Sequence, residues 1–312
     1  MNIVYLGTPE FAIPSLKVLL ETKWVNILAI CTQTDKQAGR GNKVKEPPVK
    51  RLAIESGLLV FQAEKISQDK ELINKLKDLK PDILITCAFG QILNQEVLDI
   101  APHGVINVHA SLLPKYRGAA PINWAILNGE TEAGISIMKT ELGLDTGPVI
   151  VQDKCTIEKN ETSIELTKKL SLLGAKTLIQ SLELIDKGEA KYIPQDNSQA
   201  TKAPSLKKEL GLINWDDTAQ NIHNKIRALQ PWPSAYTHFK DKVIKLWESQ
   251  ISDLNPSYTS QPVGTIIEIK DYIRVKTQDG FIDIYKVQPE NKNIINSKDW
   301  VNGARIQTGD KF

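Results

Sequence analysis

Cysteine is scarce in this chain, and its scarcity excludes two kinds of scaffold. Only three cysteines occur among 312 residues, Cys31, Cys87 and Cys155, and none stands in a Cys-x-x-Cys spacing. A disulfide framework or a zinc site needs paired or clustered cysteines, so we expect reduced thiols, each in or beside a strand. No cluster of histidine, cysteine and carboxylate residues has the spacing of metal ligands, and we expect no metal.

Long apolar runs are also absent. No uninterrupted stretch is long enough to span a bilayer. Residues 1–7 lack a basic region before their apolar run, so they predict a first strand and not a signal peptide. We therefore expect a cytoplasmic protein without a membrane partner, and a monomer. The formal net charge is only +2, which excludes a global polycation and requires any nucleic-acid surface to be local.

The first half of the chain alternates predicted strands and helices. Apolar runs at 3–6, 24–31, 59–61, 82–87 and 105–109 predict strands, and amphipathic stretches between them predict helices, the first with Phe11 on its apolar face. This order predicts an α/β domain with a Rossmann-like, mostly parallel sheet and helices on both faces. The first turn holds only one of the three glycines of Gly-x-Gly-x-x-Gly, which disfavours a dinucleotide cofactor.

The length favours more than one domain. We expect a first domain over residues 1–188 and a linker over 189–208, where proline, glycine, asparagine and serine break regular structure. After a helix at 218–229, short alternating runs separated by turn signals predict a small antiparallel β-barrel, OB-like, over residues 209–312.

Residues 105–121 are the most informative stretch. The strand at 105–109 ends in Asn107-Val108-His109, and side chains alternate faces along a strand, so Asn107 and His109 point the same way. A neutral amide donor beside a titratable imidazole suits binding and polarisation of a carbonyl oxygen. The next residues are rich in glycine and proline and predict a loop over that surface. A second loop, 143–147, carries Asp145 between glycines, which allow a sharp turn that presents one carboxylate.

Together these segments resemble the 10-formyltetrahydrofolate-dependent formyltransferases. The resemblance rests on Asn107-Val108-His109, on the run from Ser111 to Pro121 and on Gly-Leu-Asp-Thr-Gly at 143–147, and it covers essentially the whole chain. Within that superfamily the chain is most similar to the members that formylate initiator methionyl-tRNA for translation initiation, which also share its extended C-terminal half. The resemblance implies 10-formyltetrahydrofolate as formyl donor and initiator methionyl-tRNA as acceptor.

The resemblance also implies binding residues. Ser111, Leu112, Leu113 and Pro114 are implied to contact the folate. Residues 32–48 form a long, polar and basic connection that suits contact with tRNA phosphates. The 209–312 domain is expected to bind tRNA as well. The residues implied to bind tRNA are Phe11, Arg40, Lys43, Lys45, Lys207 and Lys208. Arg117 is expected to meet either the glutamate tail of the folate or a tRNA phosphate.

The residue types agree with formyl transfer. Asn107 is expected to donate to the developing oxyanion, and His109 to donate to it or to carry a proton near neutral pH. Asp145 is expected to orient His109 or to assist proton removal from the amine, and the sequence leaves open which of the two is the final base. Three alternatives also stay open: formyl transfer to a sugar-nucleotide amine, hydrolysis of formyltetrahydrofolate, and a non-catalytic RNA-binding module.

Overall fold

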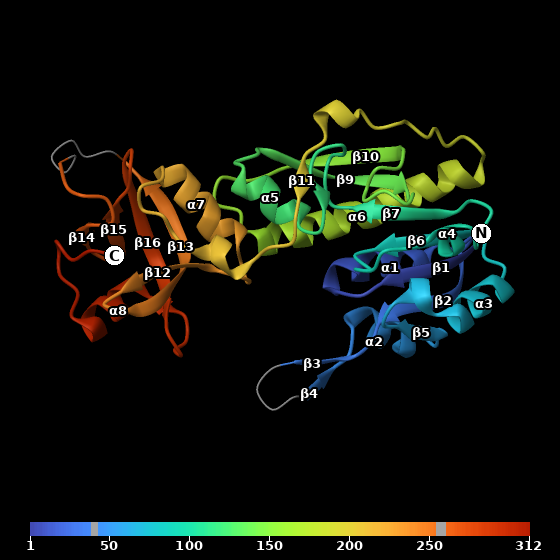
Figure 1. The fold of residues 1–312 in the computed structure, drawn as a ribbon, viewed down its shortest axis with the longest axis horizontal. Helices are drawn as coiled ribbons and strands as arrows, with labels where there is room; N and C mark the ends of the chain where they lie inside the picture. The colour runs from blue at the N-terminus through green and yellow to red at the C-terminus, as the bar shows by residue number, and fades with distance from the viewer. Residues whose placement is uncertain (39–42, 254–259) are drawn as a thin grey trace. The chain divides into compact units, whose positions relative to one another are not determined.

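The computed structural model describes residues 1–38, 43–253 and 260–312. The chain divides into two compact units, shown with their elements in Figure 1. The first unit holds Met1–Pro121, Glu132–Cys155 and Thr167–Pro204. The second unit holds Ile122–Thr131, Thr156–Leu166 and Ser205–Phe312. The predicted domain boundaries at 188 and 209 remain predictions.

The first unit is built on a seven-stranded sheet with the strand order β10-β9-β7-β6-β1-β2-β5. Neighbouring strands are parallel from β7 to β5, whereas β7 and β9 are antiparallel, so the expected mostly parallel sheet is confirmed. The strands are β1 Asn2–Gly7, β2 Asn26–Gln33, β5 Val60–Ala63, β6 Ile83–Cys87, β7 Val105–His109, β9 Glu132–Lys139 and β10 Val149–Thr156. The cysteines lie in β2, β6 and β10, as expected.

Helices cover both faces of this sheet, because its buried strands are apolar on both sides. The helices and 3-10 turns of this unit are η1 Glu10–Ala12, α1 Ile13–Glu21, α2 Pro48–Glu55, η2 Ile66–Gln68, α3 Lys70–Asp78, α4 Gln95–Leu98, η3 Asn197–Gln199 and most of α6 Ser163–Asp186, whereas α5 Pro121–Leu127 falls in the second unit after its first residue. On one face, apolar residues of α3 and α4 share a core cluster with Val4, Leu84 and Val105. On the other, a Cβ built on Gly174 of α6 would lie 3.0 Å from Val108 of β7.

Two local features differ from expectation. Phe11 lies in the 3-10 turn η1 before α1, where it is half-buried. The polar connection between β2 and α2 contains a two-stranded pair, β3 Lys36–Ala38 with β4 Lys43–Lys45, which projects from the first unit (Figure 1). The charged residues of such a short, solvated pair carry no apolar alternation, so the sequence pattern did not show it.

The second unit contains an antiparallel sheet with the strand order β12-β13-β16-β15-β14, and β17 pairs with β16. Its elements are η4 Lys208–Gly211, α7 Ala219–Ala228, β12 Ala235–Phe239, β13 Lys242–Ser252, β14 Ile266–Ile269, β15 Ile273–Lys276, β16 Phe281–Pro289, β17 Ile295–Asn296 and α8 Ser297–Ala304. Thr218 caps α7 by accepting a hydrogen bond from Asn221 N at 3.1 Å. The expected antiparallel C-terminal domain is confirmed.

An aromatic cluster closes the core of the second unit. The ring of Phe312 stacks on Trp215 with centroids 5.2 Å apart and on Trp300 with centroids 6.0 Å apart. Phe239 meets Trp300 edge-on at 5.5 Å. Stacked and edge-on pairs add to the free energy that burial of these large rings already contributes. Within the described residues, no helix combines the length and apolar character that crossing a membrane requires.

Candidate active site

Asn107 and His109 project from β7 on the face opposite Val108. Val108 is buried and faces Gly174 of α6, so alternation along the strand directs its two neighbours to the other face. His109 is 5% exposed, and Asn107 is half-buried. The structure therefore brings the predicted amide and imidazole to one surface at the carboxyl end of a parallel strand, where ligands of open α/β sheets bind.

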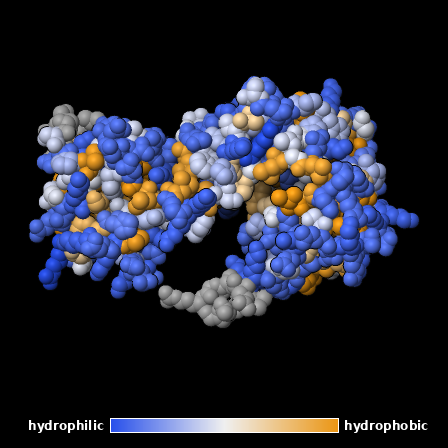
Figure 2. Space-filling view, in the orientation of Figure 1, coloured by the Kyte–Doolittle hydropathy of each residue, from blue (hydrophilic) through white to orange (hydrophobic). Residues whose placement is uncertain are grey.

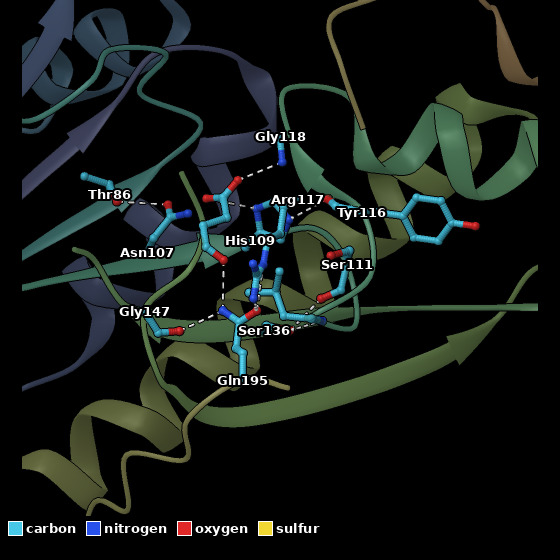
Figure 3. A network of polar contacts seen from close by, with 12 residues as sticks. Thr86, Asn107, His109, Ser111, Tyr116, Arg117, Gly118, Ser136, Gly147 and Gln195 are labelled. Carbon is cyan, nitrogen blue, oxygen red and sulfur yellow. Dashed lines mark hydrogen bonds and ion pairs between the residues drawn. The ribbon is translucent and has the colours of Figure 1, made fainter. Parts of the chain in front are cut away.

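A threonine on the neighbouring strand orients the Asn107 amide. Thr86 of β6 is the register partner of Asn107, and its hydroxyl donates to Asn107 Oδ1 at 2.9 Å (Figure 3). Because the hydroxyl occupies the amide oxygen, Asn107 presents its N–H₂ group to a ligand. Thr86 was not predicted as a site residue, although its place in the buried strand 82–87 was a signal, since a buried hydroxyl needs a partner.

The imidazole of His109 is held on both sides. Its Nε2 lies 3.0 Å from the carbonyl oxygen of Tyr116, which can only accept, so Nε2 carries a hydrogen. Its Nδ1 lies 3.6 Å from Asp145 Oδ1, which is an ion-pair distance and longer than a hydrogen bond. Both side chains are shielded, with 6% of His109 and 12% of Asp145 exposed. A proton arriving on Nδ1 therefore meets a carboxylate in a site with little water to screen the attraction.

Asp145 sits in a tight turn between β9 and β10. Its φ of 52° lies in the left-handed region, and its Oδ2 accepts a hydrogen bond from Gly118 N at 2.8 Å. Gly147 is required in this turn, because a Cβ there would lie 1.9 Å from the carbonyl oxygen of Lys139. The turn thus carries the carboxylate to His109, and the predicted triad is brought together by elements distant in sequence.

Two further side chains complete the network around this turn. Gln195 donates from Nε2 to the carbonyl oxygens of Asp145 at 2.9 Å and Gly147 at 2.7 Å (Figure 3). Arg117 donates to Gln195 Oε1 from Nε at 3.0 Å and from Nη2 at 2.7 Å. Arg117, which we expected at a folate tail or a tRNA phosphate, thus has partners within the chain. Gln195 has no recognisable sequence signal, because it lies among turn-forming residues that predict a linker.

The predicted folate-contacting residues form a fixed loop after β7. Ser111 donates from Oγ to the carbonyl oxygen of Lys115 at 2.6 Å. Leu113 N donates to Ser136 Oγ at 3.0 Å, and Ser136 donates from Oγ to the carbonyl oxygen of Ser111 at 2.6 Å. Ser111 and Leu113 are buried, while Leu112 and Pro114 are half-buried and offer apolar surface. These hydrogen bonds hold the loop in one conformation, and its contact with a folate remains a prediction.

A cavity of about 610 Å³ lies beside the Asp145 turn. Its lining comes from residues 95–105 and 139–143 and includes Leu98, Val105 and Leu142. Thr140 also lines it, and the buried Thr140 Oγ1 has no hydrogen-bond partner within the described residues. The lining is more polar than apolar and also includes Gln95, Asp99, Lys139 and Glu141. Figure 2 shows hydrophobic residues gathered on part of a mainly hydrophilic surface of the first unit.

The residues predicted to bind tRNA are not gathered into one cluster within a unit. Phe11 and Lys45 belong to the first unit, and Lys207 and Lys208 to the second. The lysines at 45, 207 and 208 are exposed. The backbone of Lys43 lies in β4, whereas Arg40 falls outside the described residues.

The fold and the site define a formyl-transferring enzyme. The family profile described as Formyl transferase matches residues 1–182, and the profile described as Formyl transferase, C-terminal domain, matches residues 205–305. Methionyl-tRNA formyltransferase of Clostridioides difficile is 43% identical over 310 residues, covering 99% of both chains. That of Dictyoglomus thermophilum is 43% identical over 318 residues, covering 100% of both. The chain belongs to the methionyl-tRNA formyltransferase family.

Solved structures show the same fold at low identity. The N-formyltransferase from Helicobacter canadensis, in complex with folinic acid and dTDP-3-aminofucose, matches with a TM-score of 0.70 at 21% identity, covering 92% of this chain and 98% of that one. HypX from Aquifex aeolicus matches with a TM-score of 0.65 at 16% identity, covering 100% of this chain and 49% of that one.

Proposed function

We propose that this protein transfers the formyl group of 10-formyltetrahydrofolate to the α-amine of initiator methionyl-tRNA, giving N-formylmethionyl-tRNA. The observation that supports this proposal most directly is that Asn107 and His109 share one face of β7 and that His109 Nδ1 lies 3.6 Å from Asp145 Oδ1. Family membership supports the acceptor, since the relatives that match over the full length are methionyl-tRNA formyltransferases. A monomer suffices, because all three side chains come from one chain.

The cavity beside the Asp145 turn supports the formyl-donor part of the proposal. We propose that the ring of the donor lies there along Leu98 and Val105, among the polar side chains that share the lining. The rigid loop from Ser111 to Pro114 provides the second folate contact of the proposal. When bound, the donor supplies a formyl carbon that an amine attacks, forming a new C–N bond as the bond to the folate nitrogen breaks.

Each side chain of the triad has a defined part. Asn107 directs its N–H₂ group at the formyl oxygen and stabilises the charge that grows there, because Thr86 holds the amide oxygen away. His109 takes the proton that the attacking amine loses, on Nδ1, since Nε2 already donates to Tyr116. Asp145 stabilises the resulting imidazolium from 3.6 Å. The proton then passes to the folate nitrogen as it leaves.

The acceptor requires a basic surface for tRNA. We propose that Phe11, Lys43, Lys45, Lys207 and Lys208, with Arg40, contact the acceptor arm. Exposed ammonium groups bind backbone phosphates and release counterions, which gives sequence-independent affinity. The half-buried Phe11 ring is suited to stacking on an unpaired base at the acceptor end.

Formyl transfer to three acceptors in parallel tests this proposal. Charged initiator tRNA, charged elongator tRNA and a sugar-nucleotide amine are each mixed with 10-formyltetrahydrofolate, and a reaction without acceptor measures hydrolysis. We expect transfer to initiator methionyl-tRNA to be the fastest. Equal rates on the two tRNAs would remove the initiator assignment. A preference for the sugar-nucleotide amine, or hydrolysis as the main reaction, would remove the tRNA assignment altogether.

A further inference from the structure

Residues 193–203, here called the strap, cross the first unit and are held at both ends. At one end, Ile193 exchanges two backbone hydrogen bonds with Val149, at 2.8 and 2.9 Å. At the other, β11 (Lys202–Ala203) pairs with β8 (Arg117–Gly118). Because the strap backbone is fixed at two points, ordering the side chains between these points costs little additional conformational entropy.

Gln195 is the contact between the strap and the catalytic turn. Its amide nitrogen donates one hydrogen to the carbonyl oxygen of Asp145 and one to that of Gly147. These two carbonyls flank Thr146, so one side chain clamps the turn on both sides. The left-handed backbone of Asp145 is a sparsely populated conformation that persists only where surrounding contacts impose it.

Arg117 decides which end of the Gln195 amide faces the turn. A guanidinium group can only donate, and both Nε and Nη2 of Arg117 point at Gln195 Oε1. The amide nitrogen is therefore forced toward the carbonyl oxygens. Nη2 also donates to Asn197 Oδ1 at 2.9 Å, which ties Arg117 to a second position on the strap.

The two-residue strand β8 holds both the backbone and the carboxylate of Asp145. Arg117 reaches the Asp145 backbone through Gln195, and its neighbour Gly118 donates its N–H to the Asp145 carboxylate at 2.8 Å. Gly118 has a φ of 128°, and a Cβ there would lie 2.5 Å from the carbonyl oxygen of Ala203 in the strap. The turn, the strap and β8 are thus fastened to one another around a single carboxylate.

We propose that Gln195, oriented by Arg117, is a positioning residue that fixes the Asp145 carboxylate at His109 for the formyl-transfer step. This inference rests on the proposed function. Gln195 does not line the cavity beside the turn, so its loss disturbs alignment and not donor binding. Misplacement of a reacting group by about an ångström costs on the order of a hundredfold in rate. Loss of the clamp is therefore expected to lower kcat while KM for either substrate changes little.

The isosteric change Gln195→Glu tests the clamp, since a carboxylate keeps the bond to Arg117 but cannot donate to two carbonyls. We expect kcat to fall at least tenfold in Gln195→Glu and in Gln195→Ala, with both KM values within twofold of wild type. The matched control is Gln199→Ala, in the same strap, because the side chain of the exposed Gln199 donates to Asp196 Oδ2 at 3.0 Å and not to the Asp145 turn. Its kcat should stay within twofold of wild type.

A second readout does not depend on activity. In protein labelled with ¹⁵N-glycine, the Gly118 amide should exchange with solvent faster in both Gln195 variants than in wild type or Gln199→Ala, because its acceptor, the Asp145 carboxylate, is no longer held. Three results would each overturn the proposal. They are a wild-type kcat in Gln195→Glu, a loss of kcat/KM that arises from KM alone, and an unchanged Gly118 exchange rate. If the wild-type enzyme transfers formyl to no acceptor, the proposed function fails, and the exchange rates still decide whether Gln195 holds the turn.

Discussion

Thr86 donates its hydroxyl hydrogen to Asn107 Oδ1 at 2.9 Å across the β6–β7 pair. This bond decides what Asn107 offers to a substrate, because an amide with its oxygen occupied presents only hydrogens. In the proposed reaction, Asn107 would therefore stabilise a negative oxygen without adding a formal charge, and the His109–Asp145 pair would balance the charge that develops.

Replacing Asn107 by alanine tests the oxyanion donor. We expect Asn107→Ala to lower kcat by about a hundredfold, the usual effect of removing one such donor. Thr86→Val keeps the Asn107 amide but removes the hydrogen bond that orients it. The loss of one hydrogen bond predicts that kcat falls by about two- to tenfold. Steady-state kinetics with saturating tRNA and folate measure both. A kcat for Asn107→Ala within about threefold of wild type would show that the oxyanion is stabilised elsewhere.

Lys207 and Lys208 are expected to bind phosphate. The double change Lys207→Ala/Lys208→Ala should weaken tRNA binding and reduce the slope of log Kd against log salt by about 1.5, since each phosphate contact contributes about 0.7 to 0.9. Filter binding between low and moderate salt measures the slope. Lys75→Ala/Lys77→Ala is the matched control, because these lysines are paired with Glu71 and Glu96. An equal slope in both double variants would place the phosphates on other residues.

His223 makes the second unit sensitive to acid. Burial lowers its pKa, the carbonyl of Lys159 opposes this shift, and the positive charge of Arg227 adds to it. Unfolded histidine titrates near about 6.5, so between that pH and the lower folded pKa the unfolded chain binds more protons. The free energy of unfolding should therefore fall as the pH drops through this window.

Urea unfolding of wild type and His223→Gln at pH 7.5 and at pH 5.5 measures this contribution. We expect the difference in free energy of unfolding between the two pH values to be smaller in the variant. Ser249, which meets His223 Nδ1 at 3.0 Å, lets the ring stay neutral at the higher pH. Identical pH dependence in the two proteins would assign the acid sensitivity to other groups.

The buried thiols should be inert in the folded protein. Burial raises the pKa of Cys31 to about 12 and that of Cys87 to about 11, and neither is exposed. Thiolate is the reactive form, so at pH 8 an aromatic disulfide reagent should titrate at most one thiol, Cys155, before denaturant is added. All three should react in urea. Rapid reaction of a second thiol in the native protein would show that β2 or β6 opens readily.

The sequence predicted those parts of the fold that repeat a local pattern. The strand at 105–109 was placed correctly because a short β-branched run follows turn formers. Alternation along that strand puts Asn107 and His109 on one face. The glycines around Asp145 indicated a turn that presents a carboxylate, but local sequence does not say that this turn meets His109.

The missed elements have little local signal. The strands β8 and β11 are two residues long and pair across more than eighty positions, and such pairs follow from the tertiary fold rather than from periodicity. The helix α4 spans only four residues. Composition marked residues 189–208 as irregular, but it does not say what an irregular segment touches. The contact of Arg117 with Gln195, and that of Gln195 with the Asp145 turn, were therefore found only in the structure.

The contact between Gln195 of the strap and the Asp145 turn has a consequence for the synthesis of the protein. Asp145 is translated fifty positions before Gln195. During translation, Asn107, His109 and Asp145 are therefore added to the chain before Gln195, the residue proposed to align the carboxylate. On the proposed role of Gln195, full catalytic competence is expected only after residue 195 has been added to the chain.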